Sequence, residues 1–359
     1  MRIAILSMQR VVNYGSVLQA YSLKKMLEQI SGEEISFIDI DEERKISVDM
    51  PIKDIDDYKG KRRKPGAFEM IKKRVMYFVQ KRFAFRLITG FMESELKSCN
   101  DENYDLVVVG SDEVFKSTDS IRLQLYGDIP NARNKVTYAA SCGSAVIEGI
   151  PLEKREIVEK ALSNFSRMSV RDKGTYDYIK SLYHKDIEYH LDPVLSGDLY
   201  RTPHKPVRLK NYMIVYAYNG RFDDKAEIDS IKSFAKGKGL KTVCFGGVLT
   251  WCDLFLPVTP MRLLDYFYYA DYVVTDTFHG TIFSIINHRQ FCSFTRTTNR
   301  NKLGDLLERL GLSQRLVTRA EELEEKITAQ IDYRKVDAVL EEERKRTIGY
   351  LTDCIDMVR

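Results

Sequence analysis

Residues 2–40 read RIAILSMQRVVNYGSVLQAYSLKKMLEQISGEEISFIDI, and this stretch decides the fold. It begins with a short apolar run, passes through a polar turn that contains Gly15, and then carries apolar residues at helical spacing between Val17 and Gln29. A second apolar run follows at 35–40. Strand, helix and strand in this order predict a β-α-β unit, which favours a parallel sheet with helices on its faces.

The pattern continues along the chain with predicted strands at 105–109, 136–140 and 165–170, followed by a Pro-containing polar stretch at 195–206. It then restarts. The predicted elements of the second half are strands at 212–216, 242–245, 272–275 and 291–294 and helices at 224–237, 261–269 and 280–287.

The sequence therefore predicts an α/β fold of two doubly wound Rossmann-like domains facing a cleft, as in the GT-B architecture. We expect an N-terminal domain over 1–197 and a C-terminal domain over 198–359. A helix over 320–346 and an amphipathic end over 350–358 are expected to pack back across the junction.

Composition excludes several classes of protein. The chain has 359 residues, of which 44% are hydrophobic and 30% charged, as in a globular protein that buries a sizeable core. A net charge of +4 without a basic tail argues against nucleic acid as a partner. The cysteines stand singly and predict neither a disulfide framework nor a metal site. Without a signal peptide or a spanning apolar run, a cytoplasmic location is expected.

The segment 59–97 is a predicted basic amphipathic helical insertion. Between Lys59 and Arg86 there are eleven Lys or Arg residues and one acid, Glu69. Three interpretations stay open: a helix that packs on the core with a solvated basic face, a surface that binds another protein, or a docking surface for an anionic acceptor. A lipid-diphosphate-linked sugar at the inner face of the membrane is an acceptor of this kind.

Two candidate binding segments follow predicted strands of the first domain. Asn13 and Gly15 lie where the first strand meets the first helix, and Gly110 and Ser111 end a buried strand at 107–109. In open α/β sheets ligands bind at this edge, where backbone N–H groups and helix dipoles are exposed. A turn with a helix cap is the alternative interpretation of the first segment.

The strand at 107–109 also delivers two carboxylates, Asp112 and Glu113. Either one is a candidate to orient an acceptor hydroxyl or to take its proton. A helix-capping role for the aspartate is the competing interpretation.

The segment TDTFHGTI at 275–282 is the main candidate of the second domain. Asp276 and Thr277 follow a strand, and a helix is expected to begin at His279 or Gly280, with Thr281 in its first turn. A helix N-terminus attracts anions, and a histidine at its start adds a hydrogen-bond donor or a proton.

Further candidates to bind an anion are cations outside these segments. Arg171 follows the strand at 165–170, and Arg296, Arg300 and Lys302 follow the last predicted strand. Arginine pairs in a bidentate manner with carboxylate or phosphate. For each cation taken singly, and for Arg296 above all, a surface or ion-pair role is the alternative.

Taken in order, these segments resemble the polysaccharide pyruvyl transferase family. The resemblance spans residues 3 to about 317 and includes two further stretches at 138–144 and 190–195. Glu113 and Phe115 stand where the family often has Gln and Trp, and Thr277 where Ser is common. These departures are mild. The order and spacing of the segments are more specific to the family than any single motif.

The resemblance implies transfer of pyruvate from phosphoenolpyruvate, the donor substrate, onto two hydroxyls of one sugar residue as a ketal, in surface polysaccharide biosynthesis. It implies donor binding by Arg171, His279 and the region of Arg300 and Lys302. No metal or other cofactor is expected. We expect the first domain to bind the acceptor and the second the donor, with His279 contacting phosphate or donating a proton and Asp112 or Glu113 as the base.

Two other functions remain alternatives. The same two-domain shape suits a glycosyltransferase that uses a nucleotide sugar, which needs a nucleotide pocket in the second domain. A glycan-binding protein of a polysaccharide assembly complex, without catalysis, is the other, and His279 together with the set of cations argues against it.

Overall fold

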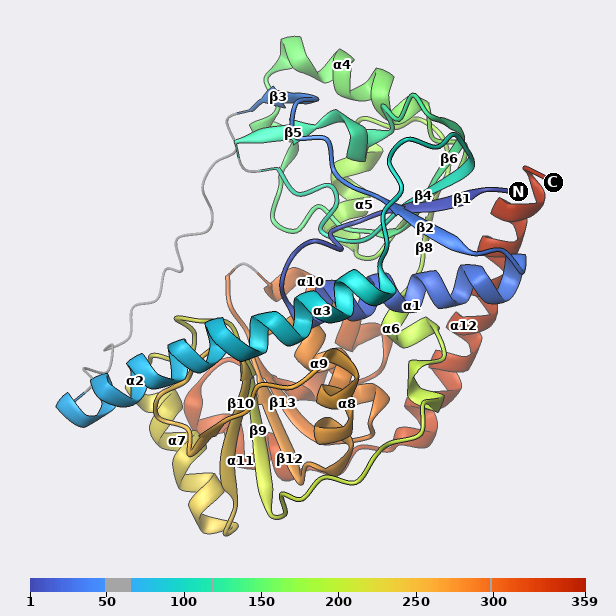
Figure 1. Ribbon diagram of the computed structural model, residues 1–359. Helices are drawn as coiled ribbons and strands as arrows, with labels where there is room; N and C mark the ends of the chain where they lie inside the picture. Colours follow the sequence, from blue (N-terminus) through green and yellow to red (C-terminus); the bar gives the residue numbers. More distant parts are fainter. Residues whose placement is uncertain (49–65, 118, 298) are drawn as a thin grey trace.

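The computed structural model describes residues 1–48, 66–117, 119–297 and 299–359, and it confirms an α/β fold with two parallel sheets (Figure 1). The first sheet has the strand order β2-β1-β4-β6-β7-β8. Its strands are β1 (Ile3–Leu6), β2 (Ile35–Ile38), β4 (Tyr104–Asp112), β6 (Ala132–Ala140), β7 (Met168–Val170) and β8 (Ile187–Tyr189). The middle of β4, residues 106–109, is fully buried and apolar because helices cover both faces of a parallel sheet.

The second sheet has the strand order β11-β10-β9-β12-β13-β14, and all its neighbouring strands are parallel. Its strands are β9 (Tyr212–Ala217), β10 (Lys241–Gly246), β11 (Leu254–Phe255), β12 (Tyr272–Thr275), β13 (Gln290–Phe294) and β14 (Leu316–Val317). A small antiparallel ribbon of β3 (Lys45–Ser47) and β5 (Ser120–Arg122) flanks the first sheet.

The helices alternate with the strands, as the β-α-β pattern predicts. In the first part of the chain they are α1 (Tyr14–Ser31), α2 (Ala67–Val79), α3 (Phe85–Glu95), α4 (Leu152–Ser163), α5 (Lys173–Lys180) and α6 (Pro193–Ser196). In the second part they are α7 (Lys225–Gly237), α8 (Pro260–Tyr269), α9 (Phe278–Ile286), α10 (Arg300–Arg309), α11 (Leu323–Thr328) and α12 (Tyr333–Asp356). No helix within these described residues is long and apolar enough to cross a membrane.

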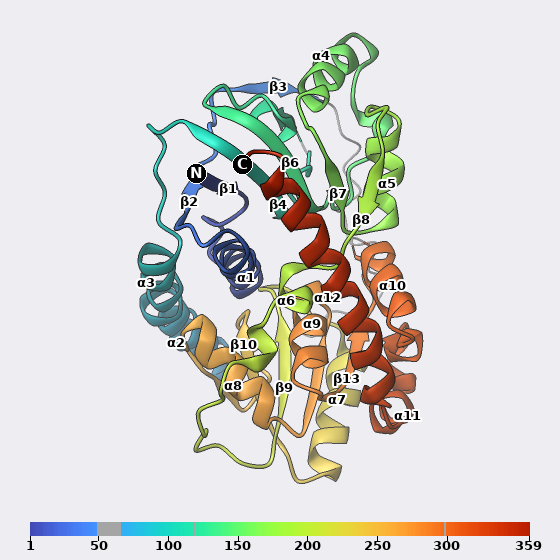
Figure 2. The same cartoon turned by 90° about the vertical axis from the view of Figure 1, so that its right-hand side faces the viewer.

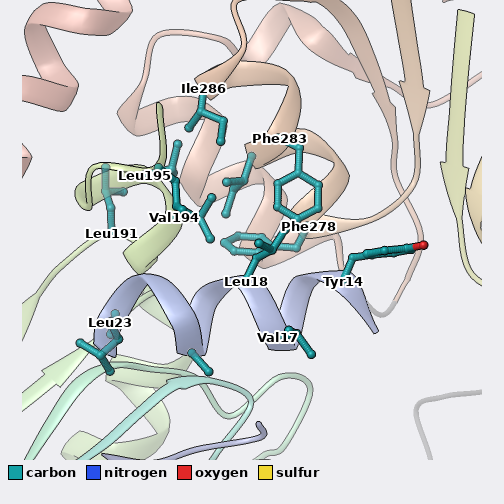
Figure 3. Close-up of a cluster of buried hydrophobic side chains, with 14 of the residues drawn as sticks. Tyr14, Val17, Leu18, Leu23, Leu191, Val194, Leu195, Phe278, Phe283 and Ile286 are labelled. Atoms are coloured by element: carbon teal, nitrogen blue, oxygen red, sulfur yellow. The ribbon is translucent and has the colours of Figure 1, made fainter. Parts of the chain in front are cut away.

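One hydrophobic core joins the two sheets. Figure 3 shows Leu18 of α1 beside Val194 of α6 and Phe278 and Phe283 of α9, with Val17 on the opposite face of α1. All five side chains are buried, and they belong to a cluster that also includes residues from both sheets. Because domains that share a large apolar interface resist relative motion, this core fixes the N-terminal ends of α1 and α9 with respect to each other.

The last helix, α12, runs from the second sheet back to the first (Figure 2). The Tyr350 hydroxyl donates to the carbonyl of Thr137 at 2.8 Å, and Nε of Arg344 donates to the carbonyl of Leu195 at 3.1 Å. Asp353 pairs with Arg167 at 3.1 Å. The end of the chain thus packs on elements of the N-terminal half.

The predicted helix over 320–346 is wrong. Helix α11 ends at Thr328, and α12 begins at Tyr333 and continues to Asp356. The buried guanidinium of Arg315 donates to the carbonyls of Lys326 at 2.6 Å and Ala329 at 2.5 Å. These carbonyls close to the C-terminus of α11 are satisfied by Arg315, so the chain turns here instead of continuing as helix.

The basic insertion forms one long helical segment that lies along the second domain (Figure 1). A single π-helical turn, Gln80–Ala84, joins α2 to α3. Nε2 of Gln80 donates to the carbonyl of Gly246 at 2.6 Å, and the Thr250 hydroxyl donates to Glu69 at 2.6 Å. Residues 59–65, which the prediction included, lie outside the described residues.

His190 makes stability depend on pH. Its side chain is buried and pairs through Nδ1 with the Ser169 hydroxyl at 2.8 Å. Burial, with the neighbouring Arg346, Arg309 and Arg167, lowers the pKa of His190 to about 3. In the unfolded chain the imidazole binds a proton near pH 6.5. The unfolded state therefore binds more protons below that pH, and stability falls as the pH falls towards 3.

We expect His190 to account for a loss of about 2 kcal/mol between about pH 7 and about pH 5. Urea unfolding of the His190→Asn variant at both pH values isolates this contribution, because asparagine keeps a polar atom near Ser169 and does not titrate. The variant should lose less stability than the natural protein over this interval. An equal loss in both proteins would contradict the assignment.

Candidate active site

A cavity of about 450 Å³ lies at the edge of both sheets where the strands end. Asp112 and Glu113 reach it from the end of β4, and Arg171 from the end of β7. Asp276 and His279 reach it from the opposite side, after β12. The remaining lining residues are Met8, Val11, Asn13, Ser16, Lys116, Ser144, Tyr218, Arg221, Thr277, Phe278, Asn299 and Lys302. The carboxyl edges of two parallel sheets thus meet in one site, as expected for this fold.

Two helices begin at the cavity and point their positive ends into it. The side chain of Asn13 caps α1 by accepting from the N–H of Ser16 at 2.8 Å, and Thr277 caps α9 by accepting from the N–H of Gly280 at 2.9 Å. Each cap satisfies one of the free N–H groups of the first turn. The remaining groups and the helix dipoles make this part of the cavity attractive to an anion.

Gly15 brings the start of α1 directly against His279. A Cβ atom at position 15 would lie 2.2 Å from Nδ1 of His279 and 2.9 Å from its Cβ. No larger residue fits there without moving the imidazole. The absence of a side chain at Gly15 therefore allows the His279 ring to lie where it does, although Gly15 does not line the cavity itself.

His279 is 4% exposed and lies in the first turn of α9. Its Nε2 atom is 3.5 Å from Oδ2 of Asp192, and it has no well-formed hydrogen bond to any residue that the structure describes. Burial acts to raise the pKa of Asp192, but His279, Arg171 and the N–H of Val194 together hold it below its ordinary value. An ionised carboxylate therefore lies beside the imidazole.

Arg171 lines the cavity as a buried side chain and contacts residues of both domains. Nη1 contacts Oδ2 of Asp192 at 2.8 Å, and Nη2 lies 3.8 Å from Oδ1 of Asp112. The guanidinium carbon lies 4.2 Å from the centre of the Phe278 ring, in the arrangement of a cation–π contact. Burial acts to lower the pKa of Arg171, but Asp192, Asp112 and other nearby carboxylates raise it above its usual value, so the side chain is a permanent cation.

Asp112 belongs to a short chain of hydrogen bonds that ends at the cavity. Nδ2 of Asn13 donates to the Ser16 hydroxyl at 3.0 Å, and that hydroxyl donates to Oδ2 of Asp112 at 2.7 Å. Asp112 has a φ of 72°, a left-handed conformation that Asp adopts more readily than most residues. The carboxylate is thereby fixed between α1 and Arg171.

Glu113 forms an ion pair across the cleft. Its Oε1 accepts from Nζ of Lys302, at the start of α10, at 2.5 Å, and its Oε2 lies 3.3 Å from Nζ of Lys116. Burial acts to raise the pKa of Glu113, but Lys302 and Lys116 outweigh it and hold the pKa well below the usual range. Glu113 is therefore an ionised partner for two cations.

Arg296 has a structural role next to the cavity. It contacts Glu227 at 2.6 Å and Asp276 at 2.9 Å, and all three side chains are largely buried. Nδ2 of Asn299 donates to the carbonyl of Asp276 at 2.6 Å. These contacts hold the loop that leads from β12 to His279.

The remaining predicted residues lie beside the cavity without lining it. The Ser111 hydroxyl donates to the carbonyl of Ala139 at 2.8 Å, and the Thr281 hydroxyl pairs with Ser293 at 2.6 Å, so both side chains point into the sheets. Gly110 and Gly280 permit close packing, since a Cβ atom would lie 2.2 Å from the Tyr138 carbonyl and from the Thr275 hydroxyl, respectively. Arg300 is exposed at the start of α10 and is not among the lining residues.

Several residues of the site were missed by sequence reasoning. Asp192 lies three positions after the end of β8, a strand that was not predicted, and it contacts Arg171 and His279 without lining the cavity. Tyr218 and Arg221 come just after β9. Lys116 and Ser144 follow β4 and β6 in loops that carry no recognisable pattern.

Solved structures with a similar architecture extend over the whole chain. Staphylococcus aureus MnaA, in a co-structure with UDP, matches with 11% identity and a TM-score of 0.51, covering 98% of this chain and 94% of the other. The glycosyltransferase SnogD of Streptomyces nogalater has 12% identity and a TM-score of 0.41, and the match covers 100% of this chain and 99% of the SnogD chain. The O-GlcNAc transferase of Thermobaculum terrenum has 10% identity and a TM-score of 0.44. The match covers 99% of this chain and 66% of the transferase chain.

At these identities the similarity concerns the fold alone, and the GT-B-like architecture of two Rossmann-like domains is confirmed. No curated protein sequence matches the chain. The sequence pattern of the family described as polysaccharide pyruvyl transferase matches residues 13–298, which include every residue named above for the cavity except Met8, Val11, Asn299 and Lys302. The chain therefore belongs to the polysaccharide pyruvyl transferase family, and it is a transferase with a GT-B-like fold.

Proposed function

We propose that this protein transfers pyruvate from phosphoenolpyruvate onto two hydroxyls of one sugar residue as a ketal and releases phosphate. One observation carries the proposal: a single cavity combines the N-termini of α1 and α9 with His279 and with cations from both domains. These cations are Lys116, Arg171, Arg221 and Lys302. A small donor that carries a carboxylate and a phosphate needs several positive groups arranged around it.

The proposed reaction balances in three steps. A proton adds to the methylene carbon of phosphoenolpyruvate, which becomes the methyl group, and one sugar oxygen forms a bond to the neighbouring carbon. The bond from that carbon to the phosphate oxygen then breaks. The second sugar oxygen closes the ketal, and of the two hydroxyl protons one replaces the proton taken from the acid and the other leaves with the phosphate.

His279 is the proposed group that contacts phosphate and donates the proton. It is buried at the mouth of α9, and its Nε2 lacks a well-formed hydrogen bond to the described residues. The ionised Asp192 at 3.5 Å supplies a counter-charge for a protonated ring. Correctly placed proton transfer contributes about 10²- to 10⁴-fold to the rate.

Asp112 is the better candidate for the base than Glu113. A base must have an affinity for protons, and Lys302 and Lys116 lower the proton affinity of Glu113 strongly. Asp112 lines the cavity and accepts the Ser16 hydroxyl with one oxygen, while its other oxygen lies 3.8 Å from Arg171. We assign Asp112 as the base that takes the proton of the acceptor hydroxyl. Glu113 is assigned as the carboxylate that holds Lys302 in position.

Neutralising Asp112 and neutralising Glu113 are predicted to change different kinetic constants. Asp112→Asn should lower kcat by about 10²-fold or more because it removes the base. Glu113→Gln should change kcat little and raise the KM for phosphoenolpyruvate by about tenfold, since it loosens Lys302. Steady-state kinetics on both variants checks this. A larger kcat loss in Glu113→Gln than in Asp112→Asn would reverse the assignment.

The proposal includes no cofactor besides the donor substrate. The acceptor is a sugar of a growing surface polysaccharide that is carried on a lipid diphosphate. The N-terminal domain supplies Asp112 on the acceptor side, and the C-terminal domain supplies His279 and Lys302 on the donor side.

Calorimetry with phosphoenolpyruvate and with UDP tests the donor assignment. Phosphoenolpyruvate should bind with a 1:1 stoichiometry, and Lys302→Met should weaken this binding because it removes a cation from the cavity. Binding of UDP without binding of phosphoenolpyruvate would support a nucleotide-sugar glycosyltransferase instead. Staphylococcus aureus MnaA, which has a similar fold, is named as a co-structure with UDP, so this outcome is the relevant alternative.

A further inference from the structure

The helical segment 67–95 exposes an unusual amount of apolar surface. Of the sixteen large hydrophobic residues that are exposed in the described part of the chain, seven lie within the eighteen positions from 70 to 87. They are Met70 (53% exposed), Ile71 (63%), Val75 (57%), Phe78 (64%), Phe83 (50%), Phe85 (37%) and Leu87 (36%). A dense cluster of exposed large apolar side chains marks a binding surface.

The same segment is strongly basic. Between positions 70 and 92 the sequence has six Lys or Arg residues and no acid. All but Lys72 are exposed, namely Lys73, Arg74, Lys81, Arg82 and Arg86. Cations mixed with exposed apolar side chains on one helix are typical of a surface that lies on an anionic membrane.

The inner face of the segment is already occupied, so the exposed face is not a packing surface left open. Met76, Gln80, Ala84, Ile88 and Met92 are all buried. The π-helical turn at Gln80–Ala84 inserts one residue into the helical repeat and lets residues four positions apart share this face along its length. Hydrogen bonds from Lys72 to the Cys252 carbonyl and from Gln80 to the Gly246 carbonyl fix the segment on the second domain.

We propose that the exposed face of α2 and α3, with the π-helical turn between them, docks on the surface of an anionic phospholipid bilayer. Apolar side chains such as Ile71 and Phe78 enter the interface, and the surrounding Lys and Arg residues pair with lipid phosphates. The N-terminal end of α2 projects beyond the other described elements (Figure 1), so a flat surface can reach it. The charge of the segment is complementary to this partner, which distinguishes it from a purely apolar protein-binding groove.

A groove lies between this segment and the candidate active site. Its volume is about 260 Å³, and Gln80, Ala84, Phe85 and Ile88 form the wall on the side of the helix. Asn13 and Tyr218 line both the groove and the active-site cavity. If the proposed function holds, a lipid-linked sugar reaches the cavity along this groove while its lipid remains in the bilayer.

Sedimentation with vesicles tests the docking. The natural protein should bind vesicles that contain phosphatidylglycerol, should not bind pure phosphatidylcholine vesicles, and should bind less at high salt because salt screens the attraction. The triple variant Ile71→Ser, Val75→Ser, Phe78→Ser should bind anionic vesicles at least about tenfold more weakly, and so should Arg74→Gln, Lys81→Gln, Arg82→Gln.

The matched control replaces three exposed apolar residues elsewhere, Leu152→Ser, Ile157→Ser and Ile348→Ser, and should leave vesicle binding unchanged. Equal binding of the control and the apolar triple variant overturns the proposal. A natural protein that stays in solution with both vesicle types also overturns it and points to a protein partner. Vesicle binding requires no turnover, and turnover of a free sugar requires no vesicle, so failure of this proposal is distinguishable from failure of the proposed function.

Discussion

Replacing His279 with glutamine should lower kcat for pyruvyl transfer by about 10²- to 10⁴-fold, the range expected when a positioned proton donor is lost. Glutamine places an amide near the position of Nε2 and therefore keeps a hydrogen-bond donor, but it does not transfer a proton. His279 is buried in the first turn of α9, and its ring packs on Gly15. Steady-state kinetics with saturating acceptor gives kcat and the KM for phosphoenolpyruvate separately.

The comparison with His279→Ala separates the two proposed roles of this residue. If His279 contacts phosphate as well as donating the proton, the alanine variant should raise KM in addition to lowering kcat, whereas the glutamine variant should affect mainly kcat. Circular dichroism and the unfolding midpoint should change little in the glutamine variant. A glutamine variant with a natural kcat would exclude His279 as the proton donor.

Replacing Arg171 with methionine should destabilise the protein by about 3–5 kcal/mol, because a buried ion pair loses one partner and leaves carboxylates without their cation. Arg171 is 3% exposed and contacts Asp192 at 2.8 Å, and Asp112 lies 3.8 Å away. Methionine preserves much of the volume and the contact with Phe278. Urea unfolding at neutral pH measures the effect.

The double variant Arg171→Met, Asp192→Asn is the control for this argument. Neutralising Asp192 removes the principal unpaired charge, so the double variant should recover a measurable part of the stability that Arg171→Met loses. Asp112 keeps its charge, and the recovery should therefore be incomplete. A loss below about 1 kcal/mol in Arg171→Met would show that the buried pair is not a major source of stability.

Much of the fold follows from sequence periodicity. Apolar runs that alternate with helical spacing predicted β1, α1 and β2 in the first domain and β9, β10, β12 and β13 in the second, with bounds that differ by a few residues, whereas the short β11 was not predicted. The signal is strong because strands buried on both faces of a parallel sheet must be apolar throughout. Helix caps such as Asn13 and Thr277 add local signals that are independent of tertiary packing.

Other features depend on contacts between distant parts of the chain, which periodicity does not report. The end of α11 is determined by Arg315, which lies outside the helical pattern, 11 positions before Lys326 and 14 before Ala329. The basic segment packs on the second domain through a hydrogen bond from Gln80 to the Gly246 carbonyl, which is 166 positions away. Neither contact leaves a periodic trace in the local sequence.

In the candidate site, too, the local sequence predicted individual residues but not the contacts between them. Asn13, Asp112, Glu113, Arg171, Asp276, Thr277, His279 and Lys302, which were predicted singly from strand ends and helix starts, line one cavity. Their pairings were not predictable, and the pairings change the roles. Glu113 was an equal candidate for the base until its contact with Lys302 showed why its pKa is low. Asp192 was missed because its significance depends on Arg171 and His279.

The shared hydrophobic core gives the site a further property. Because Leu18 packs with Phe278 and Phe283 in one buried cluster, the N-termini of α1 and α9 are held together before any ligand binds. A preorganised anion site avoids the cost of assembling it when the donor arrives. We therefore expect phosphoenolpyruvate to bind without the acceptor.

The most direct test of the central claim is a turnover experiment with phosphoenolpyruvate and a panel of free and lipid-linked acceptors that contain galactose, mannose or glucose. Phosphate release and the acceptor mass are measured together, with His279→Ala as the control. We expect phosphate release that depends on an acceptor, accompanied by a mass gain of one pyruvate less one water, and loss of both in the variant. Absence of phosphate release with every acceptor, together with absence of phosphoenolpyruvate binding by calorimetry, would contradict the proposed function.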